Sequence, residues 1–177
     1  MRRTTKETDI EVELDVEGTV ETGDPVLNHL LMALFHYMGR NARVKANYDL
    51  RHHLWEDVGI TLGLELREKL PGKFARFGSA VMPMDDALIL VALDISGRPY
   101  LNLELFPLEE EEGFSVTLVR EFLWGLARSL RATIHVKQLG GVNAHHIIEA
   151  AFKGLGIALA QAIAESERLE STKGVLE

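Results

Sequence analysis

The sequence predicts an α+β fold made of two copies of one unit, each a small sheet covered by two helices. The predicted elements of both halves end with a helix, a strand and a second helix. The segment HHLWEDVGITLGLEL, which starts at His52, also aligns with HHIIEAAFKGLGIAL, which starts at His145, at an offset of 93 residues. We interpret this match as an internal duplication, in which halves of about residues 1–72 and 73–177 form a single domain.

The elements of the first half follow from hydrophobic periodicity and from turn residues. Polar and apolar side chains alternate along the first predicted strand, which is the period of a half-buried strand. The first predicted helix is apolar at helical spacing and stops before Gly39, a residue type common at helix ends. The second predicted helix stops before Pro71 and Gly72. The predicted order is strand 4–16, helix 26–38, strand 43–50 and helix 53–70.

The second half begins with three strands and then repeats the pattern of helix, strand and helix. The turn sequences Pro-Met-Asp-Asp and Ser-Gly-Arg-Pro separate the three strands. An acidic run at residues 109–113 is predicted to be a solvated loop. The predicted order is strands 74–81, 87–95 and 100–106, helix 114–130, strand 132–139 and helix 144–167.

Composition excludes several classes of function. With 46% hydrophobic and 26% charged residues, the 177-residue chain has the balance of a globular protein that buries its own core. Because it has no cysteine, a metal site must use imidazole and carboxylate ligands, which suit Mn, Fe, Zn, Ni or Co. The net charge of −8 argues against nucleic acid and anionic membranes as partners. Without an apolar signal segment or membrane span, we expect a cytoplasmic protein.

Two HisHis pairs, each followed by a glutamate, are the strongest indication of chemistry. On a helix, His52 and Glu56 are four residues apart and share a face, whereas His53 is turned by about 100° from His52. Each motif therefore suits two ions, with one histidine and the glutamate on one ion and the other histidine on the second. Structural histidines would explain one such pair, but packing does not require imidazole at both equivalent places. The equivalent residues of the second motif are His145, His146 and Glu149.

Two further histidines complete a possible ligand set. His29 lies near the start of the first predicted helix, and His135 interrupts an apolar alternation in a strand. Together with the two motifs they give six histidines and two glutamates, enough for three histidines and one glutamate on each of two ions. His36 has no such context, and we interpret it as structural.

Short segments of specific composition are spread along the chain, and in them the sequence resembles the imidazoleglycerol-phosphate dehydratase family. The double HHxxE motif with the terminal STKG is the most specific combination. The resemblance implies dehydration of D-erythro-imidazole glycerol phosphate to imidazole acetol phosphate in histidine biosynthesis, with two Mn²⁺ ions per subunit. It also implies a fold similar to a duplicated second domain of ribosomal protein S5, and a homo-oligomeric cage of 24 subunits, built from trimers, with shared metal sites. The segments are RTTKET, LNHLL, HHLWEDVGITLG, RFG, PMDDAL, DISGRP, HHIIEAAFK and STKG.

The resemblance also implies roles for residues outside the two motifs. Glu7 would be the proton shuttle, and Asp85 would hydrogen-bond the substrate or simply begin a turn. Metal ions on the imidazole ring would act as Lewis acids and as a template. Cations and donors at the phosphate-binding positions of the family are Arg76, Arg98, Lys153, Ser171 and Lys173.

Two positions depart from the family pattern. The family has an aspartate before the histidine of the first helix, where this chain has Asn28. An aspartate would orient His29 as a hydrogen-bond acceptor, and the asparagine carbonyl would do so more weakly. The acidic residue just before the first HisHis pair is also missing, and Arg51 lies there instead.

Two other classes of function compete with the enzyme. A non-catalytic divalent-metal-binding protein would explain the HHxxE motifs, but not the basic residues or the terminal STKG. An RNA-binding module is compatible with the fold, but the net charge of −8 and the lack of a basic stretch with interleaved aromatics argue against it.

Overall fold

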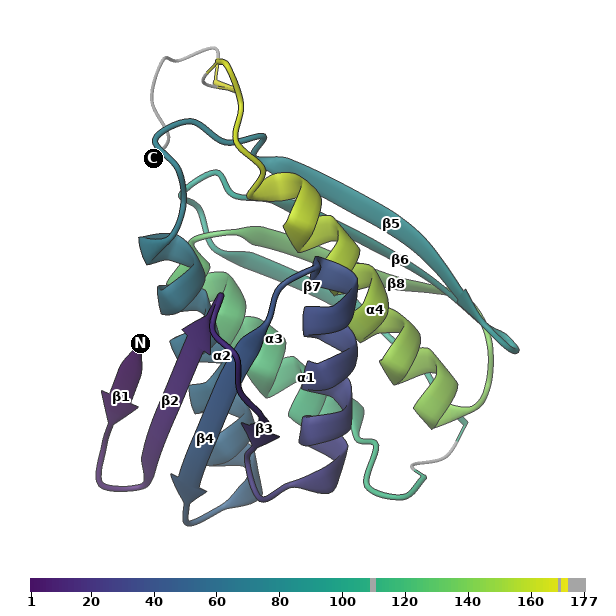
Figure 1. The fold of residues 1–177 in the computed structure, drawn as a ribbon. Coiled ribbons are helices and arrows are strands. Elements are labelled where there is room, and N and C mark those ends of the chain that lie inside the picture. The colour runs from purple at the N-terminus through teal and green to yellow at the C-terminus, as the bar shows by residue number, and fades with distance from the viewer. Residues whose placement is uncertain (109–110, 169, 172–177) are drawn as a thin grey trace.

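The computed structural model describes residues 1–108, 111–168 and 170–171. Within these residues the chain forms two four-stranded sheets with four helices between them (Figure 1). The strands are β1 (Arg2–Thr4), β2 (Thr8–Leu14), β3 (Val20–Glu21), β4 (Ala42–Tyr48), β5 (Phe77–Met84), β6 (Ala87–Asp94), β7 (Tyr100–Glu104) and β8 (Thr133–Gly140). The helices are α1 (Pro25–Met38), α2 (Arg51–Glu68), α3 (Val116–Leu130) and α4 (Ala144–Ala162).

The two sheets have the same topology. The strand order is β1-β2-β4-β3 in the first sheet and β5-β6-β8-β7 in the second. β3 pairs in parallel with β4, and β7 pairs in parallel with β8. The other neighbouring strands of both sheets pair antiparallel. The duplicated α+β fold predicted from the sequence is therefore confirmed.

The helices pack in parallel pairs that each join the two halves. α1 packs on α4 and α2 packs on α3, so the first residues of all four helices lie at one end of the molecule (Figure 1). A Cβ on Gly63 would come within 2.9 Å of the Leu126 carbonyl oxygen, and one on Gly156 within 2.4 Å of the Leu34 carbonyl oxygen. These glycines match in the sequence repeat because both helix pairs approach closely at this position.

One apolar core connects all four helices. The indole of Trp55 on α2 and the rings of Phe122 on α3 and Phe152 on α4 are all fully buried. The ring centroid of Phe152 lies 6.5 Å from that of Trp55 and 5.1 Å from that of Phe122. Such aromatic contacts fix helices relative to one another, so the ends of the helices are rigid platforms for a site. No helix in the described part of the chain is long and apolar enough to cross a membrane.

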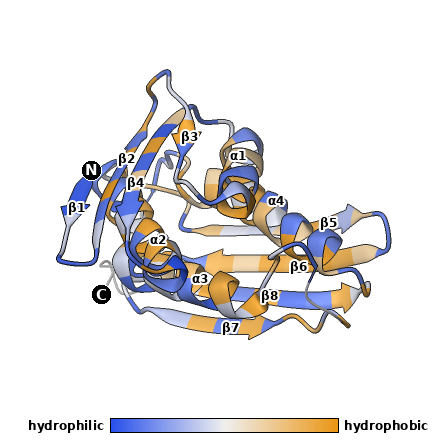
Figure 2. Ribbon diagram, turned by 90° about the horizontal axis from the view of Figure 1, so that it is seen from below, coloured by the Kyte–Doolittle hydropathy of each residue, from blue (hydrophilic) through white to orange (hydrophobic). Residues whose placement is uncertain are grey.

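The outer faces of the two sheets differ in polarity. On the first sheet, charged side chains such as Glu11 and Lys45 point away from the helices. On the second sheet, Val81, Leu90 and Leu139 point away from them, and Val81 is 55% exposed, although this face also carries the ion pair of Lys137 with Glu104. Figure 2, which colours whole strands and not single faces, shows a largely blue β1 in the first sheet and a mostly orange β6 in the second.

The N-terminal region forms a hairpin, so the prediction of a single strand over residues 4–16 is wrong. β1 ends at Thr4 and β2 begins at Thr8. The hydroxyl oxygen of Thr5 accepts hydrogen bonds from the backbone N–H groups of Glu7 and Thr8, at 3.1 and 3.0 Å, and closes a turn. Periodicity alone does not reveal this turn, because it depends on a side chain that replaces a backbone partner.

The last predicted helix, 144–167, ends earlier, at Ala162. Backbone groups of residues 164–166 bond instead to those of residues 73–75. The end of α4 is therefore tied to the connection between the two halves.

The first strand of the second half is displaced from the predicted range of 74–81. Arg76 has a positive φ of 72°, which interrupts the extended backbone, and β5 begins only at Phe77. The strand then continues through Pro83 to Met84. A proline is tolerated there because β5 lies at the edge of its sheet.

Candidate functional site

A first cluster of candidate metal ligands joins α1 to α4. His29 lies on α1, and His145 and Glu149 lie one turn apart on α4. The Nε2 atoms of both imidazoles are 2.8 Å from Oε2 of Glu149. One candidate ligand atom from each side chain lies within 4.8 Å of the other two. Two imidazoles and a carboxylate suit first-row divalent cations, so the chemistry of this donor set fits a metal ion.

Neighbouring side chains hold this cluster in place. The ring of Phe114 stacks on the imidazole of His145, with centroids 4.4 Å apart. Nζ of Lys153 lies 3.0 Å from Oε1 of Glu149. Burial, the largest single influence, raises the pKa of Glu149, but hydrogen bonds from the two histidines and Lys153 outweigh it and lower the pKa to about 2. The carboxylate is therefore ionised at neutral pH, as metal coordination requires.

A second cluster forms where the β1–β2 turn meets α2. Nδ1 of His53 lies 2.8 Å from Oδ1 of Asp49 and 3.8 Å from Oε2 of Glu7. The hydrogen bond with Asp49 raises the pKa of the His53 imidazole, and the same bond lowers the pKa of Asp49. The structure thus brings the predicted residues Glu7 and His53 together and adds Asp49 to them.

His146 has an equivalent place in the second half. Its Nδ1 lies 2.7 Å from Oδ1 of Asp86, and its Nε2 lies 3.4 Å from Oδ2 of Asp85. The hydrogen bond with His146, followed by two backbone N–H donors, lowers the pKa of Asp86 to about 2, and the pKa of His146 is raised by the same bond. Asp85 and Asp86 form the β5–β6 turn, just as Glu7 belongs to the β1–β2 turn. The second histidine of each HisHis pair therefore faces the first hairpin turn of its own half.

Besides His146, three predicted ligands lie apart from both three-residue clusters. Nη2 of Arg128, on α3, donates to Oε1 of Glu56 at 2.6 Å. The imidazole of His52 lies beside that of His53, with centroids 4.1 Å apart. His135 projects from the exposed outer face of β8. Among the described residues of one chain, neither cluster includes His52, Glu56 or His135.

Predicted phosphate-binding residues gather at one corner of the second sheet. Nε and Nη2 of Arg76 donate to the two carboxylate oxygens of Asp94, at 2.6 and 3.0 Å. Nη1 of Arg76 donates to the backbone carbonyl of Glu170 at 2.6 Å, which places Ser171 at the same corner. Arg98 lies in the turn that leads from β6 into β7 there.

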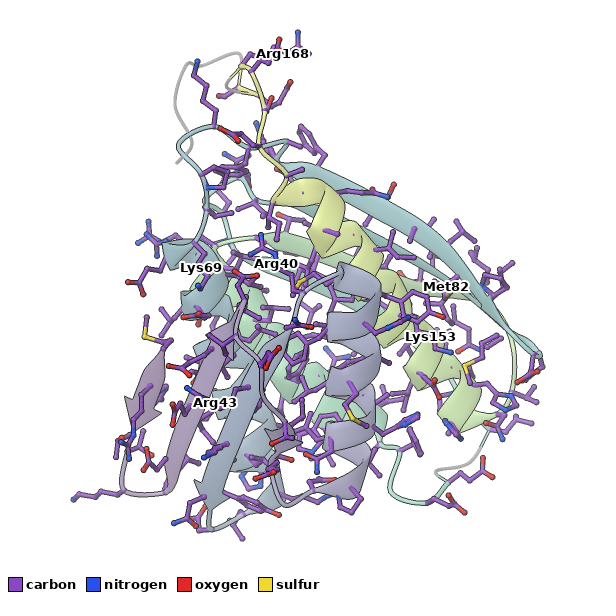
Figure 3. All side chains as sticks on the ribbon, viewed as in Figure 1. Arg40, Arg43, Lys69, Met82, Lys153 and Arg168 are labelled. Atoms are coloured by element: carbon purple, nitrogen blue, oxygen red, sulfur yellow. The ribbon has the colours of Figure 1, made fainter. Side chains whose placement is uncertain are left out.

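One predicted phosphate ligand, Lys153, is not at this corner. Lys153 lies with the first cluster, beside Glu149. Figure 3 shows it well separated from Arg168, which lies near the end of the described chain. Lys173 falls outside the described residues.

The first metal-ligand cluster and the arginines of the predicted phosphate site lie at opposite ends of the folded molecule. α4 carries His145 in its first turn and ends at Ala162, whose carbonyl oxygen accepts the backbone N–H of Arg76 at 2.8 Å. At about 1.5 Å of rise per residue, α4 separates His145 from that corner by roughly 25 Å. A small substrate does not span this distance, so it cannot contact both sets within one chain.

Known proteins of similar sequence decide the family. The sequence model described as imidazoleglycerol-phosphate dehydratase matches residues 22–159. The chain belongs to the imidazoleglycerol-phosphate dehydratase family. It is 65% identical over 176 residues to the imidazoleglycerol-phosphate dehydratase of Pyrococcus furiosus, covering 99% of this chain and 100% of that relative. It is 47% identical over 186 residues to that of Metallosphaera sedula, covering 98% of this chain and 96% of the relative.

Solved structures of the family have the same fold. A crystal structure of the Pyrococcus furiosus enzyme, in complex with (S)-C348, superposes with a TM-score of 0.98 at 65% identity, covering 99% of this chain and 100% of that one. The enzyme of Staphylococcus aureus superposes with a TM-score of 0.82 at 33% identity, covering 94% and 98%. The predicted family is confirmed, and the chain is an enzyme of the hydro-lyase class.

The two departures from the family pattern have local explanations. The side-chain carbonyl oxygen of Asn28 accepts hydrogen bonds from the backbone N–H and the hydroxyl of Thr22, at 2.9 and 2.7 Å. It therefore fixes the chain before α1 and does not take the predicted role of orienting His29. Nε of Arg51 donates to Oδ2 of the buried Asp24 at 2.6 Å, so this arginine joins the first turns of α1 and α2.

Sequence reasoning did not single out three residues of the site. Asp49 precedes His53 by four residues, a spacing that places a carboxylate one turn away. Asp86 follows directly after a predicted site residue, and its role depends on the geometry of the turn. Arg128 shows no sequence signal, because its contact with Glu56 arises only from the packing of α2 on α3.

Proposed function

We propose that the chain dehydrates D-erythro-imidazole glycerol phosphate to imidazole acetol phosphate in histidine biosynthesis, in the cytoplasm. Membership of the family, with 65% identity to a relative over nearly the whole chain, supports this reaction. The structural observation that carries the proposal is the convergence of His29, His145 and Glu149 on one point. A protein that only bound metal would have no need for Arg76 and Arg98 at the opposite end of the folded molecule.

The proposal includes two Mn²⁺ ions per chain. Bound to the imidazole ring of the substrate, they would supply Lewis acidity and a template that orients the ring. The ionised state of Glu149 and the imidazoles around it support this choice of ligands. The proposed ligands are His29, His52, His53, Glu56, His135, His145, His146 and Glu149.

Glu7 is the proposed general acid–base. Its side chain is 58% exposed, so a substrate can reach Oε2, while its backbone carbonyl oxygen is held by the N–H of Asp49 at 3.1 Å. The carboxylate takes a proton from the substrate carbon next to the imidazole ring. The hydroxyl of the neighbouring carbon takes up a proton and leaves as water. Asp85 faces His146 as Glu7 faces His53, and we assign it a hydrogen bond to a substrate hydroxyl.

The phosphate is proposed to bind at the corner that carries Arg76 and Arg98. Guanidinium groups present paired N–H donors that match phosphate oxygens, and hydroxyl and ammonium groups add further donors. Lys153 lies away from this corner, and we assign it the role of holding the carboxylate of Glu149, which its ammonium contacts. The proposed phosphate ligands are Arg76, Arg98, Ser171 and Lys173.

We propose that complete sites form only between chains. The separation of roughly 25 Å between His145 and the arginine corner supports this proposal, because a small substrate could not contact both sets within one chain. His135 points outward from the second sheet, where a neighbouring chain would reach it. The apolar side chains around it favour a covered face over a solvated one. From the family resemblance, we propose that the assembly is a cage of 24 chains built from trimers.

An assay on imidazole glycerol phosphate tests the proposed function. Purified protein should dehydrate this substrate, lose activity when a chelator removes its metal, and regain it with Mn²⁺. Metal analysis should find about two ions per chain, in keeping with two equivalent motifs. Metal-replete protein that binds the ions but leaves the substrate unchanged would favour the non-catalytic alternative.

Two substitutions test the assigned roles. Arg98→Ala should mainly raise KM, because its charge contact is the same in the ground and transition states. Glu7→Gln should mainly lower kcat, with KM little changed. Lys45→Ala, on the charged outer face of the first sheet, serves as a control and should change neither constant. A reversed pattern for Arg98 and Glu7 would mean that the roles are assigned wrongly.

A further inference from the structure

Asp57 is a buried carboxylate on α2 that the proposed chemistry does not use. It lies one turn beyond His53 and is only 7% exposed. Nη2 of Arg3, in β1, lies 3.2 Å from its Oδ1, and the hydroxyl of Thr8, the first residue of β2, donates to its Oδ2. One side chain on α2 therefore holds both strands that flank the turn carrying Glu7.

The turn itself has little freedom once these contacts are made. The hydroxyl oxygens of Thr5 and Thr8 lie 3.2 Å apart, and Thr8 is buried. The Thr5 hydroxyl oxygen also accepts hydrogen bonds from the backbone N–H groups of Glu7 and Thr8. The backbone from residue 5 to residue 8 is therefore connected to Asp57 through the hydroxyl of Thr8. Glu7, by contrast, has an exposed side chain whose position near His53 follows from its backbone.

The fold does not require a carboxylate at this position. In the second HHxxE motif, Ala150 stands where the first has Asp57, as the offset of 93 residues shows (57 + 93). Ala150 is fully buried among apolar side chains. Burying an ionised group has a desolvation cost that an alanine avoids, so the carboxylate has a use beyond packing α2 on its sheet.

We propose that Asp57 is a positioning residue, which clamps the β1–β2 turn through Arg3 and Thr8 so that the carboxylate of Glu7 is held beside His53. This inference rests on the proposed role of Glu7 in proton transfer. Asp57 does not touch the substrate. It fixes where Oε2 of Glu7 stands, and misplacing a reacting group by about 1 Å is enough to lower a rate severely.

Glu65 provides a matched control on the same helix. It lies two turns beyond Asp57, on the same face, and is likewise buried, at 5% exposure. Its Oε2 contacts the ammonium of Met1 at 2.9 Å, and its Oε1 accepts the backbone N–H of Leu14 at 3.1 Å. Glu65 thus also joins α2 to the β1–β2 hairpin through a cation and a neutral donor, but at the end away from Glu7. Figure 3 labels Lys69, one turn further along, at that end.

The experiment compares Asp57→Asn with Glu65→Gln in the manganese-loaded, assembled enzyme. Both should lower the unfolding temperature, because each removes a buried charge from a paired cation. Asp57→Asn should also lower kcat by about tenfold or more with KM within about twofold, whereas Glu65→Gln should leave kcat nearly unchanged. Equal losses of kcat, or none for Asp57→Asn, would overturn the proposal.

A double substitution asks whether Asp57 acts through Glu7. In a Glu7→Gln background, adding Asp57→Asn should lower kcat by less than about twofold, because the group being positioned has already been lost. A full additional loss would contradict the proposal. If Glu7→Gln alone leaves kcat unchanged, the role of Glu7 is wrong and this inference falls with it, even though the dehydratase activity stands.

Substitutions of Thr8 keep the test decisive if Asp57→Asn does not fold. Thr8→Val has nearly the same shape but lacks the hydroxyl that contacts Asp57, and it should lower kcat with KM little changed. Thr8→Ser restores the hydroxyl and should restore kcat. If valine and serine at this position give the same kcat, the clamp has no effect on catalysis and the proposal is wrong.

Discussion

The two sheets share one topology but present opposite surfaces. On the first sheet, Glu11 lies opposite Lys45 on the outer face, and on the outer face of the second sheet Ala92 lies opposite His135. Both inner faces are apolar, because the first sheet packs on α1 and α2 and the second packs on α3 and α4. The duplication has therefore kept what the core requires and changed what faces outward. A charged face suits solvent, whereas an apolar face with an exposed histidine suits a neighbouring chain.

The largest expected effect comes from placing a charge on the apolar face. Leu90→Glu would bury a carboxylate in the proposed contact between chains, where the residue opposite it, Lys137, already pairs with Glu104, so the assembly should dissociate and lose most of its activity. Lys45→Glu, on the outer face of the first sheet, should leave both unchanged. Light scattering and the dehydratase assay measure the two effects. A full-sized, active Leu90→Glu particle would mean that this face is not covered.

Removal of the metal should also reduce the size of the particle. Ions bound between chains stabilise the assembled state by mass action. Ligand imidazoles must be neutral, so acidification through about pH 6 should release the ions. Chelator or low pH should then give a smaller species, and Mn²⁺ at neutral pH should restore the large one. A particle that keeps its size after complete removal of metal would show that its interfaces stand alone.

A smaller effect distinguishes the N-terminal ends of α1 and α3. Asp24 caps α1 through two backbone N–H groups and also accepts hydrogen bonds from Arg51 and Trp55. Asp24→Ala should lower the free energy of unfolding by about 2–4 kcal/mol, since it leaves several buried donors without an acceptor. Ser115, which precedes α3, makes no hydrogen bond from its side chain to the first N–H groups of that helix, so Ser115→Ala removes no cap and should cost less than Asp24→Ala. Equal losses in denaturant titrations would contradict this difference.

The smallest expected effect is the pH dependence of the stability that Asp24 contributes. Burial raises the pKa of Asp24, but the hydrogen bonds from Arg51, Trp55 and the backbone outweigh it, so the folded-state pKa lies below the usual value. Its contribution to stability is therefore complete above about pH 4 and is lost as the pH falls through the lower, folded-state pKa. Asp24→Asn should unfold at nearly the same denaturant concentration as the wild type in strong acid, but well before it at pH 7. A constant difference across this range would contradict the account.

The sequence predicts the scaffold well because each cue is local. The HHxxE motifs and the matched glycines Gly63 and Gly156 reveal the duplication, since a repeat of this kind depends on the order of residues alone. Errors occur where a side chain replaces a backbone partner, as Thr5 does in the β1–β2 turn. They also occur where distant backbone segments pair, as at the end of α4.

The arrangement of the site is harder to predict from sequence. His53 and His146 lie near the carboxylates of two hairpin turns, and those contacts depend on how each helix lies against its own sheet. The distance between the HisHis pairs and Arg76 follows from the parallel direction of the helices and from the contact between Arg76 and the end of α4. Neither fact is local, so the sequence predicts the members of each set but not that the two sets lie far apart.

Mixing two inactive chains tests the central claim, that each site combines the histidines of one chain with the arginine corner of another. Chains with His145→Ala and chains with Arg98→Ala are dissociated, mixed in equal amounts and reassembled with Mn²⁺. At low substrate concentration each variant alone should be nearly inactive. The reassembled mixture should recover up to roughly a quarter of wild-type activity, because each of two contributions is intact in half of the chains. Particles assembled separately and then mixed should recover nothing. Activity of the reassembled mixture no greater than the average of the two variants would contradict the shared site.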